Sequence, residues 1–578
     1  MAHLHKKMKK GKPYYYVRET ARVGGRSKVV NQVYLGSADK IMEMALSREK
    51  TDISKLDIQE FGSLFIANLV ENYIGISDII DSVVTDSEKS KSPSIGEYFL
   101  FSVFNRMIEP KSKEALSQWY KNLAVHQIRP VDVEALNSRM YWKKWSQLSI
   151  EDIQKIAYLF FEKVHTLEPL RSDCLLFDTT NYFTYMDSKT ESKLAVRGKN
   201  KDGKDWLRQI GLALLVSRDT GVPIFYREFE GNCHDSKLFN QILEEMHTTV
   251  KKLSGQEKEL TLVFDKGINS GANIENIDMK PDLHFITSYS PYFAQSLAEK
   301  DLENFTPVNT APNHALVRQD REEDQIVALR TSREFWGQER TVVVTYNPRT
   351  AAKQRYTFEK KLHSLQRHLF EMRSKVNAQK PHWKQASKVK ERYNDVCEKL
   401  YLPKDLYDLD FTKENGRLRM WFRKNYYKIN KYISRFGKNI IITSHHDWST
   451  DDIVKASLDR YLVEDAFRQT KAGEFANMRP IWHWTDQKIS CHVLCCVIAL
   501  TYLKLISLWL ERAGVDMTPD EAMEHMRYLD SCLMWHSNKK KPVRVIEDPT
   551  PEQHIVCFWL RNIRWGLTKC SLVIICYC

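Results

Sequence analysis

The spacing of hydrophobic and polar residues changes several times along the chain, and each change predicts a different kind of element. Residues 13–36 alternate bulky and polar side chains around Gly24-Gly25, which predicts a small β-hairpin with basic flanks. From about residue 52 to 168 the apolar positions recur at helical spacing, which predicts a mostly α unit. We expect this unit to bind DNA ends, to form a dimer contact or to act only as a scaffold.

A series of strands is predicted next. The predicted strands cover residues 174–178, 209–216, 223–229, 260–265 and 284–287, with a helix capped by Asp235 or Ser236 that runs to about residue 253 and a short helical stretch before the last strand. The second and third strands form a hairpin about Asp219-Thr220-Gly221. A meander of three strands, followed by helix, strand, helix and strand, is the order of a ribonuclease-H-like α/β fold.

The predicted core is interrupted by an insertion that begins near residue 305. Within it, residues 327–346 are predicted to be strands, and residues 355–400 form a charged helical stretch. The apolar face of that stretch consists of Leu362, Leu365, Leu369 and Met372. Residues 417–438 then alternate basic and aromatic side chains, which fits either a nucleic-acid groove or the solvated face of a β-sheet.

These patterns predict six segments. They are a basic β-hairpin region (1–50), a helical DNA-binding or dimerisation domain (51–168), the first part of a ribonuclease-H-like catalytic core (169–304), an insertion domain (305–438), the second part of the core (439–515) and a C-terminal region (516–578).

Residues 460–471 carry the most informative charge pattern. On one helix, at about 100° per residue, Arg460, Glu464, Arg468 and Lys471 would fall within roughly 80° of arc. Because the other positions of the segment are largely apolar, we expect most of that helix to be buried, with one carboxylate flanked by three cations. A carboxylate that can hold a hard cation beside guanidinium donors suits an enzyme that acts on phosphodiesters.

Two further carboxylates follow predicted strands. Asp178 and Asp265 each end an apolar run, and the ends of strands are where open α/β sheets place their ligands. Taken singly, each aspartate fits a turn or helix-cap role equally well. Asp178, Asp265 and Glu464 together occur where the predicted fold order would bring three carboxylates to one site.

Composition narrows the class of partner. The chain has 578 residues, 42% of them hydrophobic, and Lys plus Arg exceed Asp plus Glu by 87 − 74 = 13, for a pI of about 9.0. This balance favours a polyanion such as nucleic acid over an acidic metabolite. A glycosidase with paired carboxylates fits poorly, because the chain is basic and shows no barrel-like repeat.

Cysteines and the chain start predict the compartment. Eleven cysteines in a chain of this length suggest a reducing environment, and we expect a cytoplasmic protein because the basic start is not followed by an apolar stretch. The run 491–510 is long and apolar but contains His492 and Lys504, which favours a buried core helix with core cysteines over a membrane span. The tail 571–578 is predicted to be a strand, or an end altered by truncation or a change of reading frame.

The acidic positions resemble a known family. Asp178, Asp265 and the pattern Arg460-x3-Glu464-x6-Lys471 are similar to the DDE transposases of bacterial insertion sequences, in the subgroup with a β-rich insertion before the Glu. The runs 177–180, 230–235, 265–267 and 478–489 match the same family, and the resemblance extends from about residue 170 to 510. The family pattern is Tyr-x2-Arg-x3-Glu-x6-Lys, and here Ser457 replaces the Tyr, which leaves a hydroxyl for a phosphate but no ring.

The resemblance implies a site and a chemistry. Asp178, Asp265 and Glu464 would hold two Mg²⁺ or Mn²⁺ ions, which suit carboxylate ligands. Ser457, Arg460 and Lys471 would contact DNA phosphates, and we add Arg468 from the helical stripe. Trp482 and Trp484 would either stack on a flipped base or pack in the core.

The implied function is cut-and-paste transposition by a metal-dependent polynucleotidyl transferase. Its partners would be double-stranded DNA, both element ends and target, and a second copy of the chain in a synaptic complex, and members of the subgroup commonly form a DNA hairpin. Two alternatives stay open: a structure-specific nuclease of the same fold, and a non-catalytic DNA-binding descendant.

Overall fold

The computed structural model forms two compact units. Unit 1 comprises residues 1–258 and 461–578, and unit 2 comprises residues 259–460. The structure describes residues 2–9, 12–23, 26–48, 53–85, 93–170, 174–187, 189–200, 203–254, 259–292, 294–537 and 539–562. The predicted strand at 571–578 and the glycine turn at 24–25 therefore lie outside the described residues.

Unit 1 begins with an antiparallel three-stranded sheet. Strands β2 (Lys12–Val23) and β3 (Arg26–Gly36) pair as predicted, and β1 (Ala2–Lys9) adds a third strand against β2. The first strand escaped prediction because its basic sequence has no hydrophobic alternation, and backbone pairing alone places it in the sheet. Helix α1 (Ala38–Arg48) follows.

The mostly helical character of residues 52–168 is confirmed. The helices are α2 (Gly62–Ile74), α3 (Ile76–Val83), α4 (Ile95–Ile108), α5 (Leu116–Lys121), α6 (Val125–Ile128), α7 (Ser138–Trp145) and α8 (Ile150–Leu167). The exception is β4 (Ile53–Glu60), which pairs with β17 (Asp530–His536), and β17 also pairs with β18 (Val543–Ile546). A pairing over such a sequence separation has no local signal.

Helix α18 (Asp486–Arg512) is the central core helix of unit 1. It is long and apolar enough to cross a membrane, and the bent pair α2–α3 also passes that test, but 89% of the most apolar window of α18 is buried inside the protein. Cys491, Cys495 and Cys496 are fully buried on it, as predicted for core cysteines. Its neighbours are α2, α4, α8 and α17 (Tyr461–Ala472), together with α19 (Pro519–Met526) and α20 (Pro551–Asn562).

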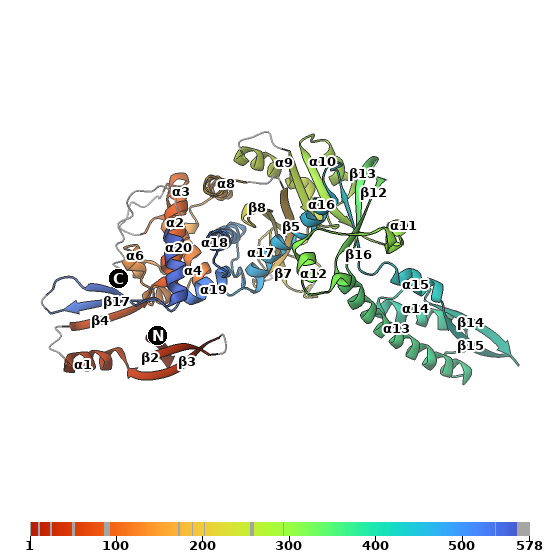
Figure 1. The fold of residues 1–578 in the computed structure, drawn as a ribbon, viewed down its shortest axis with the longest axis horizontal. Coiled ribbons are helices and arrows are strands. Elements are labelled where there is room, and N and C mark those ends of the chain that lie inside the picture. The colour runs from red at the N-terminus through yellow and green to blue at the C-terminus, as the bar shows by residue number, and fades with distance from the viewer. Residues whose placement is uncertain are drawn as a thin grey trace. The chain divides into compact units, whose positions relative to one another are not determined.

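The strand of unit 1 that carries Asp178 belongs to an antiparallel group of strands (Figure 1). They are β5 (Cys174–Thr184), β7 (Arg208–Ser217) and β8 (Pro223–Glu230), with the short β6 (Val196–Arg197) beside β7. Helix α9 (Asp235–Ser254) packs on one face of β5, where the rings of Phe177 and Phe239 lie 5.2 Å apart. The predicted strands and helix are confirmed here because their periodicity matches their burial.

Unit 2 contains a mixed sheet whose neighbours run in the order β11, β12, β13, β16, β10, β9. Its strands are β9 (Leu260–Phe264), β10 (Leu283–Tyr289), β11 (Thr306–Pro307), β12 (Val327–Phe335), β13 (Gln338–Tyr346) and β16 (Lys438–Thr443). The pair β9–β10 is parallel and the other neighbours are antiparallel. Helices α10 (Gly271–Asp278), α11 (Gln295–Ala298), α12 (Ala311–Val317) and α16 (Thr450–Leu458) belong to the same unit.

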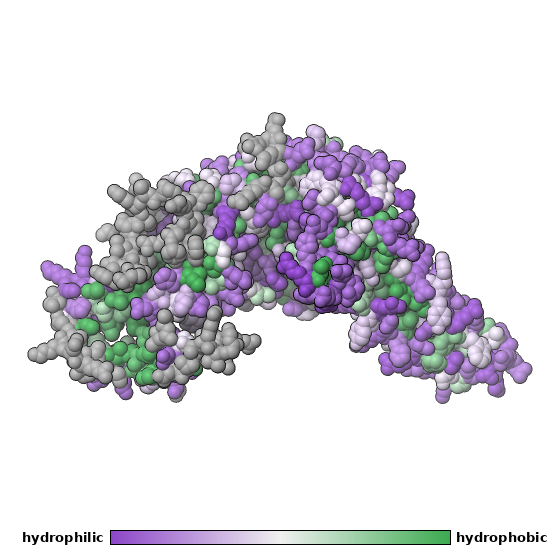
Figure 2. All heavy atoms as spheres, viewed as in Figure 1, coloured by the Kyte–Doolittle hydropathy of each residue, from purple (hydrophilic) through white to green (hydrophobic). Residues whose placement is uncertain are grey.

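Residues 348–433 of unit 2 form an arm with a hydrophobic core of its own. It consists of α13 (Pro348–Asn377), α14 (Ala386–Leu400), β14 (Tyr407–Glu414), β15 (Arg417–Lys424) and α15 (Tyr426–Ile433). The predicted apolar face of α13 is buried there, and the visible surface of the arm is mainly hydrophilic (Figure 2). The charged helical stretch predicted at 355–400 consists of two helices, α13 and α14. The alternative of a β-sheet face for residues 417–438 is wrong from residue 426 onward, because α15 begins there.

Candidate active site

In unit 1, helix α17 lies along strand β5. At its C-terminal end Lys471 donates a hydrogen bond to the hydroxyl of Thr180, and Thr470 shares a hydrogen bond with Tyr182. Near its N-terminal end, Leu462 lies 3.8 Å from the position that a Cβ on Gly221 would take, close to the first residues of β5. Two contacts in this order mean that α17 and β5 run in the same direction.

This alignment brings Glu464 and Asp178 to one side of unit 1. Asp178, Thr180 and Tyr182 share a face of β5, because side chains alternate along a strand. Glu464 and Lys471 are seven residues apart and share a stripe of α17. Since Lys471 contacts Thr180, the direction of α17 places Glu464 toward the half of β5 that carries Asp178, while a shared site for these two acids stays a prediction.

Both acids of unit 1 are within reach of solvent. Asp178 is half-buried, and one of its carboxylate oxygens accepts the backbone N–H of Thr179 at 2.8 Å. Glu464 is exposed, in the first turn of α17. Access from solvent is a condition for either carboxylate to bind a cation.

In unit 2, Asp265 directly follows β9 and is held as an ionised carboxylate. Its Oδ1 lies 2.9 Å from Nη1 of Arg460 and accepts a hydrogen bond from the Ser288 hydroxyl at 3.1 Å, while its side chain remains 42% exposed. Burial raises the pKa of Asp265, but Arg460, the backbone N–H of Lys266 and Ser288 outweigh it, so the pKa lies below its ordinary value. The carboxylate is therefore charged at neutral pH.

The predicted four-residue stripe on one helix is wrong at its first member. Helix α16 ends at Leu458 and α17 begins at Tyr461, so Arg460 lies in the turn between two helices. The sequence has no Gly or Pro at this break to signal it, and the ion pair with Asp265 fixes Arg460 outside the helix.

The expectation that most of α17 is buried is also wrong. Its buried residues are Val463, Ala466, Phe467 and Thr470, and Leu458, which was expected in the same apolar surface, is 42% exposed on α16. Helix α17 is amphipathic, and its charged face borders solvent.

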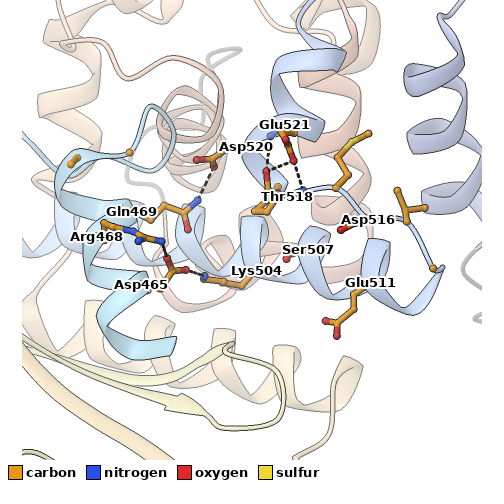
Figure 3. A pocket seen from close by; sticks show the side chains of 16 residues that line it. Asp465, Arg468, Gln469, Lys504, Ser507, Glu511, Asp516, Thr518, Asp520 and Glu521 are labelled. Atoms are coloured by element: carbon orange, nitrogen blue, oxygen red, sulfur yellow. Dashed lines mark hydrogen bonds and ion pairs between the residues drawn. The ribbon is translucent and has the colours of Figure 1, made fainter. Parts of the chain in front are cut away.

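Arg468 has an acidic partner of its own. Its guanidinium pairs with Asp465, which also binds Lys504 at 2.8 Å, and its side chain is 79% exposed. These residues line a pocket of about 860 Å³ among α17, α18 and α19, where Gln469 also donates to Asp520 (Figure 3). A DNA-binding role for Arg468 stays a prediction.

The remaining predicted DNA contacts lie on different elements. Ser457 is partly exposed on α16 of unit 2. Trp482 and Trp484 of unit 1 are 56% and 59% exposed and line a pocket of about 610 Å³ with Tyr185, so the alternative that they pack in the core is wrong. Exposed indole faces remain available for stacking.

One residue near this site had no predicted role. Arg479 lines a pocket of about 850 Å³ beside β5, together with Thr180, Asn232, Asp235 and Lys471. The predicted helix-cap residue Asp235 accepts a hydrogen bond from Thr179 at 2.7 Å in the same region. Arg479 is within the family-like run 478–489, but nothing in the run distinguishes it from a surface arginine.

The donor chemistry fits hard divalent cations, since the three predicted ligands are carboxylates that solvent can reach. Among the residues that the structure describes, no three His, Cys, Asp or Glu side chains are grouped so that they could hold a metal ion. Convergence of Asp178, Asp265 and Glu464 on metal therefore stays a prediction.

The arm of unit 2 carries most of the net charge of the chain. Residues 348–400 contain 14 Lys and Arg against five Asp and Glu, a balance of 14 − 5 = +9, compared with +13 for the whole chain. Lys353, Lys360 and Arg367 recur every seven residues on α13, on the face opposite the buried Leu362 and Leu369. Exposed basic residues in a row suit a polyanion.

Comparison with known proteins identifies the family. Residues 183–479, just over half of the chain, match the family model described as Transposase DDE domain, a range that includes Asp265 and Glu464 and begins five residues after Asp178. No curated protein matches the sequence.

Two solved structures show a low likeness. A piggyBac transposase synaptic complex with hairpin DNA is 8% identical with a TM-score of 0.35, covering 80% of this chain and 79% of that one. A Mos1 transposase paired-end complex is 13% identical with a TM-score of 0.15, covering 40% and 68%. Neither TM-score reaches the level of a shared fold. On the strength of the family match, the chain belongs to the DDE-domain transposases.

Proposed function

We propose that this protein is a DNA transposase that cuts at the ends of an insertion element and joins the freed ends to target DNA. The observation that carries the proposal is the family match over residues 183–479, which contains two of the three predicted catalytic acids. The third, Asp178, lies on the strand beside which Glu464 is positioned.

The proposed catalytic residues are Asp178, Asp265 and Glu464. They would hold two Mg²⁺ or Mn²⁺ ions, which when bound activate water or a 3′-hydroxyl and stabilise the leaving oxygen at a phosphodiester. Asp265 is prepared for this role because Arg460 and Ser288 keep it ionised. In this structure Arg460 forms an ion pair with the Asp265 carboxylate. When Asp265 binds a cation, we expect Arg460 to release it and to pair with the substrate phosphate instead.

Lys471 and the pocket beside β5 would receive the DNA strand. Lys471 is anchored by Thr180, two residues along the strand from Asp178, which positions its charge near the proposed scissile phosphate. Trp482 and Trp484 would offer aromatic surfaces to a base displaced from the duplex.

The order of elements along the chain supports a ribonuclease-H-like core. Strands β5, β7 and β8 form a meander and are followed by α9, β9, α10 and β10, which is the order predicted from the sequence. The arm and the strands β12 and β13 constitute the insertion before Glu464.

The proposed partners are double-stranded DNA and a second copy of the chain. The basic face of α13 supports DNA binding, because a row of exposed cations releases counterions from a duplex. Synapsis of two element ends would require a homodimer. We also propose that the protein acts in the cytoplasm.

The test is incubation of the full chain with Mg²⁺ and DNA that carries both ends of its element. Wild type should give excised and joined products, and Asp265→Asn and Glu464→Gln should each abolish them, with Glu474→Gln as an exposed control on the same unit as Glu464. Cleavage without joining would instead establish a structure-specific nuclease. Binding without cleavage would establish a non-catalytic DNA-binding protein.

A further inference from the structure

A second charged site lies in unit 1, in a cavity of about 450 Å³. It is bordered by α4, α7, α18, the loop after α4 and the segment after α17. Its polar walls are formed by Arg106, Lys111, Lys113, Glu114, Arg479, His483 and His492, together with Ser112 and Ser138. Trp142 and Trp482 form part of the rim. Arg479 and His483 of this cavity lie within the family-like run 478–489, but the run alone does not predict the cavity, because the other lining residues come from three distant stretches of sequence.

Two of the cations in the cavity are buried and, in the part of the chain that the structure describes, have no ion pair with an acid. Arg106 and Lys113 are only 6% and 8% exposed. Arg106 donates to Asn105 Oδ1 and to the carbonyl oxygens of Asn477 and Lys111. Lys113 donates to the Ser102 hydroxyl at 2.9 Å and lies 4.5 Å from the centre of the Trp145 ring. Within the described part of the chain, neither has a carboxylate partner, whereas buried charges in proteins are ordinarily paired.

Two carboxylates lie at the cavity: Glu114 lines it, and Glu109 pairs with the lining residue Lys111. Glu109 pairs with Lys111 at 2.7 Å, on exposed side chains, and Glu114 accepts a hydrogen bond from Ser138. With Lys111 paired to Glu109, the lining contains the cations Arg106, Lys113 and Arg479 against the one carboxylate Glu114, so its charge is positive.

Several buried polar atoms at the cavity lack a hydrogen-bond partner among the described residues. Among the described residues, the buried atoms Arg106 Nε, Arg479 Nε and His483 Nδ1 have no hydrogen-bond partner. Burial lowers the pKa of Lys113 to about 8, and burial together with Lys113 and Arg106 lowers the pKa of His483 to about 3. Both shifts have the sign expected of a site that lacks a negative charge.

We propose that this cavity binds a phosphate group, held by Arg106, Lys113 and Arg479. A tetrahedral oxyanion supplies the missing negative charge and several acceptor oxygens, and guanidinium and ammonium groups are its usual donors. Chloride would also supply negative charge, but it is a single acceptor atom, whereas the oxygens of a phosphate are spread over several ångströms and can each accept from a different side chain.

The position of Arg479 indicates where such a phosphate comes from. Arg479 lines both this cavity and the pocket beside β5 that contains Lys471 and Thr180. A DNA strand lying in that pocket could therefore place its terminal phosphate in the cavity. This source rests on the proposed function, while the phosphate site itself does not.

Binding is measured by titration calorimetry of the metal-free full chain with inorganic phosphate, at an ionic strength held constant with chloride. Two single-stranded oligonucleotides of one sequence, with and without a 5′-phosphate, are titrated in parallel. Wild type should bind phosphate, and the 5′-phosphate should increase oligonucleotide affinity. Binding of inorganic phosphate with no gain from the 5′-phosphate would support the site and assign it to free phosphate.

The decisive variant is Lys113→Met, which keeps the length of the side chain but removes its charge. Its phosphate affinity should fall roughly ten- to a hundredfold, the effect of one lost charge-assisted hydrogen bond. Lys121→Met is the matched control, because Lys121 is exposed, pairs with Glu134 and does not line the cavity. Should Lys113→Met fail to fold, the phosphate affinity of Arg479→Gln, at a half-buried position, provides a second test.

Two results would overturn the proposal. One is a wild-type chain that shows no phosphate binding beyond the chloride baseline. The other is equal phosphate affinity in wild type, Lys113→Met and Arg479→Gln, which would mean that the buried cations serve only packing. Since neither metal nor cleavage is involved, these outcomes are separate from a failure of transposition.

Discussion

The cavity around Lys113 and the basic face of α13 carry charge of the same sign in opposite environments. On α13, Lys353, Lys360 and Arg367 are exposed, and water and salt screen their mutual repulsion. In the cavity, Arg106 and Lys113 are only 6% and 8% exposed, and among the described residues neither forms an ion pair with a carboxylate. The comparison teaches that net charge alone does not locate a binding site: the exposed row suits a long polyanion at low specificity, and the buried pair suits one small anion.

The arm has a hydrophobic core of its own, and Leu365→Ala within this core should have the largest effect on stability. Leu365 is fully buried in that core, so its truncation should lower the free energy of unfolding by roughly 2 to 5 kcal/mol. The free energy of unfolding is measured by chemical denaturation, with hydrogen exchange of residues 348–433 as the signal. Ser364→Ala, on the neighbouring partly exposed position, is the control, and an equal loss there would contradict an independent core.

The cost of the buried cation is tested by the pH dependence of stability. The pKa of Lys113 is about 8 in the folded chain against 10.5 as its ordinary value, so between these pH values the unfolded state binds more protons and stability rises with pH. The gain attributable to Lys113 is up to about 3 kcal/mol. In phosphate-free buffer, denaturation curves of wild type and Lys113→Met should converge as the pH increases from 7 to 10.5, and parallel curves would refute the buried charge.

The exposed row is tested by reversing its charge in Lys353→Glu/Lys360→Glu/Arg367→Glu. Affinity for duplex DNA should fall roughly a hundredfold at low salt, and the slope of log affinity against log salt should decrease by about 3. Fluorescence anisotropy at several salt concentrations measures both. Phosphate binding in the cavity should not change, and a parallel loss there would mean that the two basic regions are not independent.

The smallest effect is expected for an exposed ion pair on the arm. Arg355 and Glu359 lie 3.3 Å apart with both side chains 61% exposed, so Glu359→Gln should change the free energy of unfolding by less than about 1 kcal/mol. It should also raise DNA affinity slightly by removing a negative charge. A loss of several kcal/mol in thermal unfolding would show that charges on the arm are not merely solvated.

Much of the local structure could be predicted, because it depends on short-range periodicity. The hairpin of β7 and β8, helix α9 and the apolar face of α13 all follow from burial patterns repeated over a few residues. Errors occurred where a distant contact overrides the local pattern. Arg460, in the turn between two helices, pairs with Asp265, almost two hundred positions earlier, and β4 is a strand because β17 pairs with it.

For the candidate site, the order of residues along the chain supplied the chemistry, and the structure supplied the surroundings. The acidic positions and the lysine that follows them were readable because family motifs are short and contiguous. The alignment of α17 on β5, the ionised state of Asp265 and the exposure of Trp482 and Trp484 were not, since each depends on which elements pack together.

The class of the protein and most of its helices and strands could thus be predicted from the sequence alone, whereas the three acids remain predicted ligands. That Arg106, Lys113 and Arg479 share one cavity, and that the first two have no ion pair with an acid among the described residues, follows from the folded structure alone. The physical reason is range: periodicity and capping act over one or two helical turns, whereas burial and electrostatic pairing depend on segments that meet only after the chain has folded.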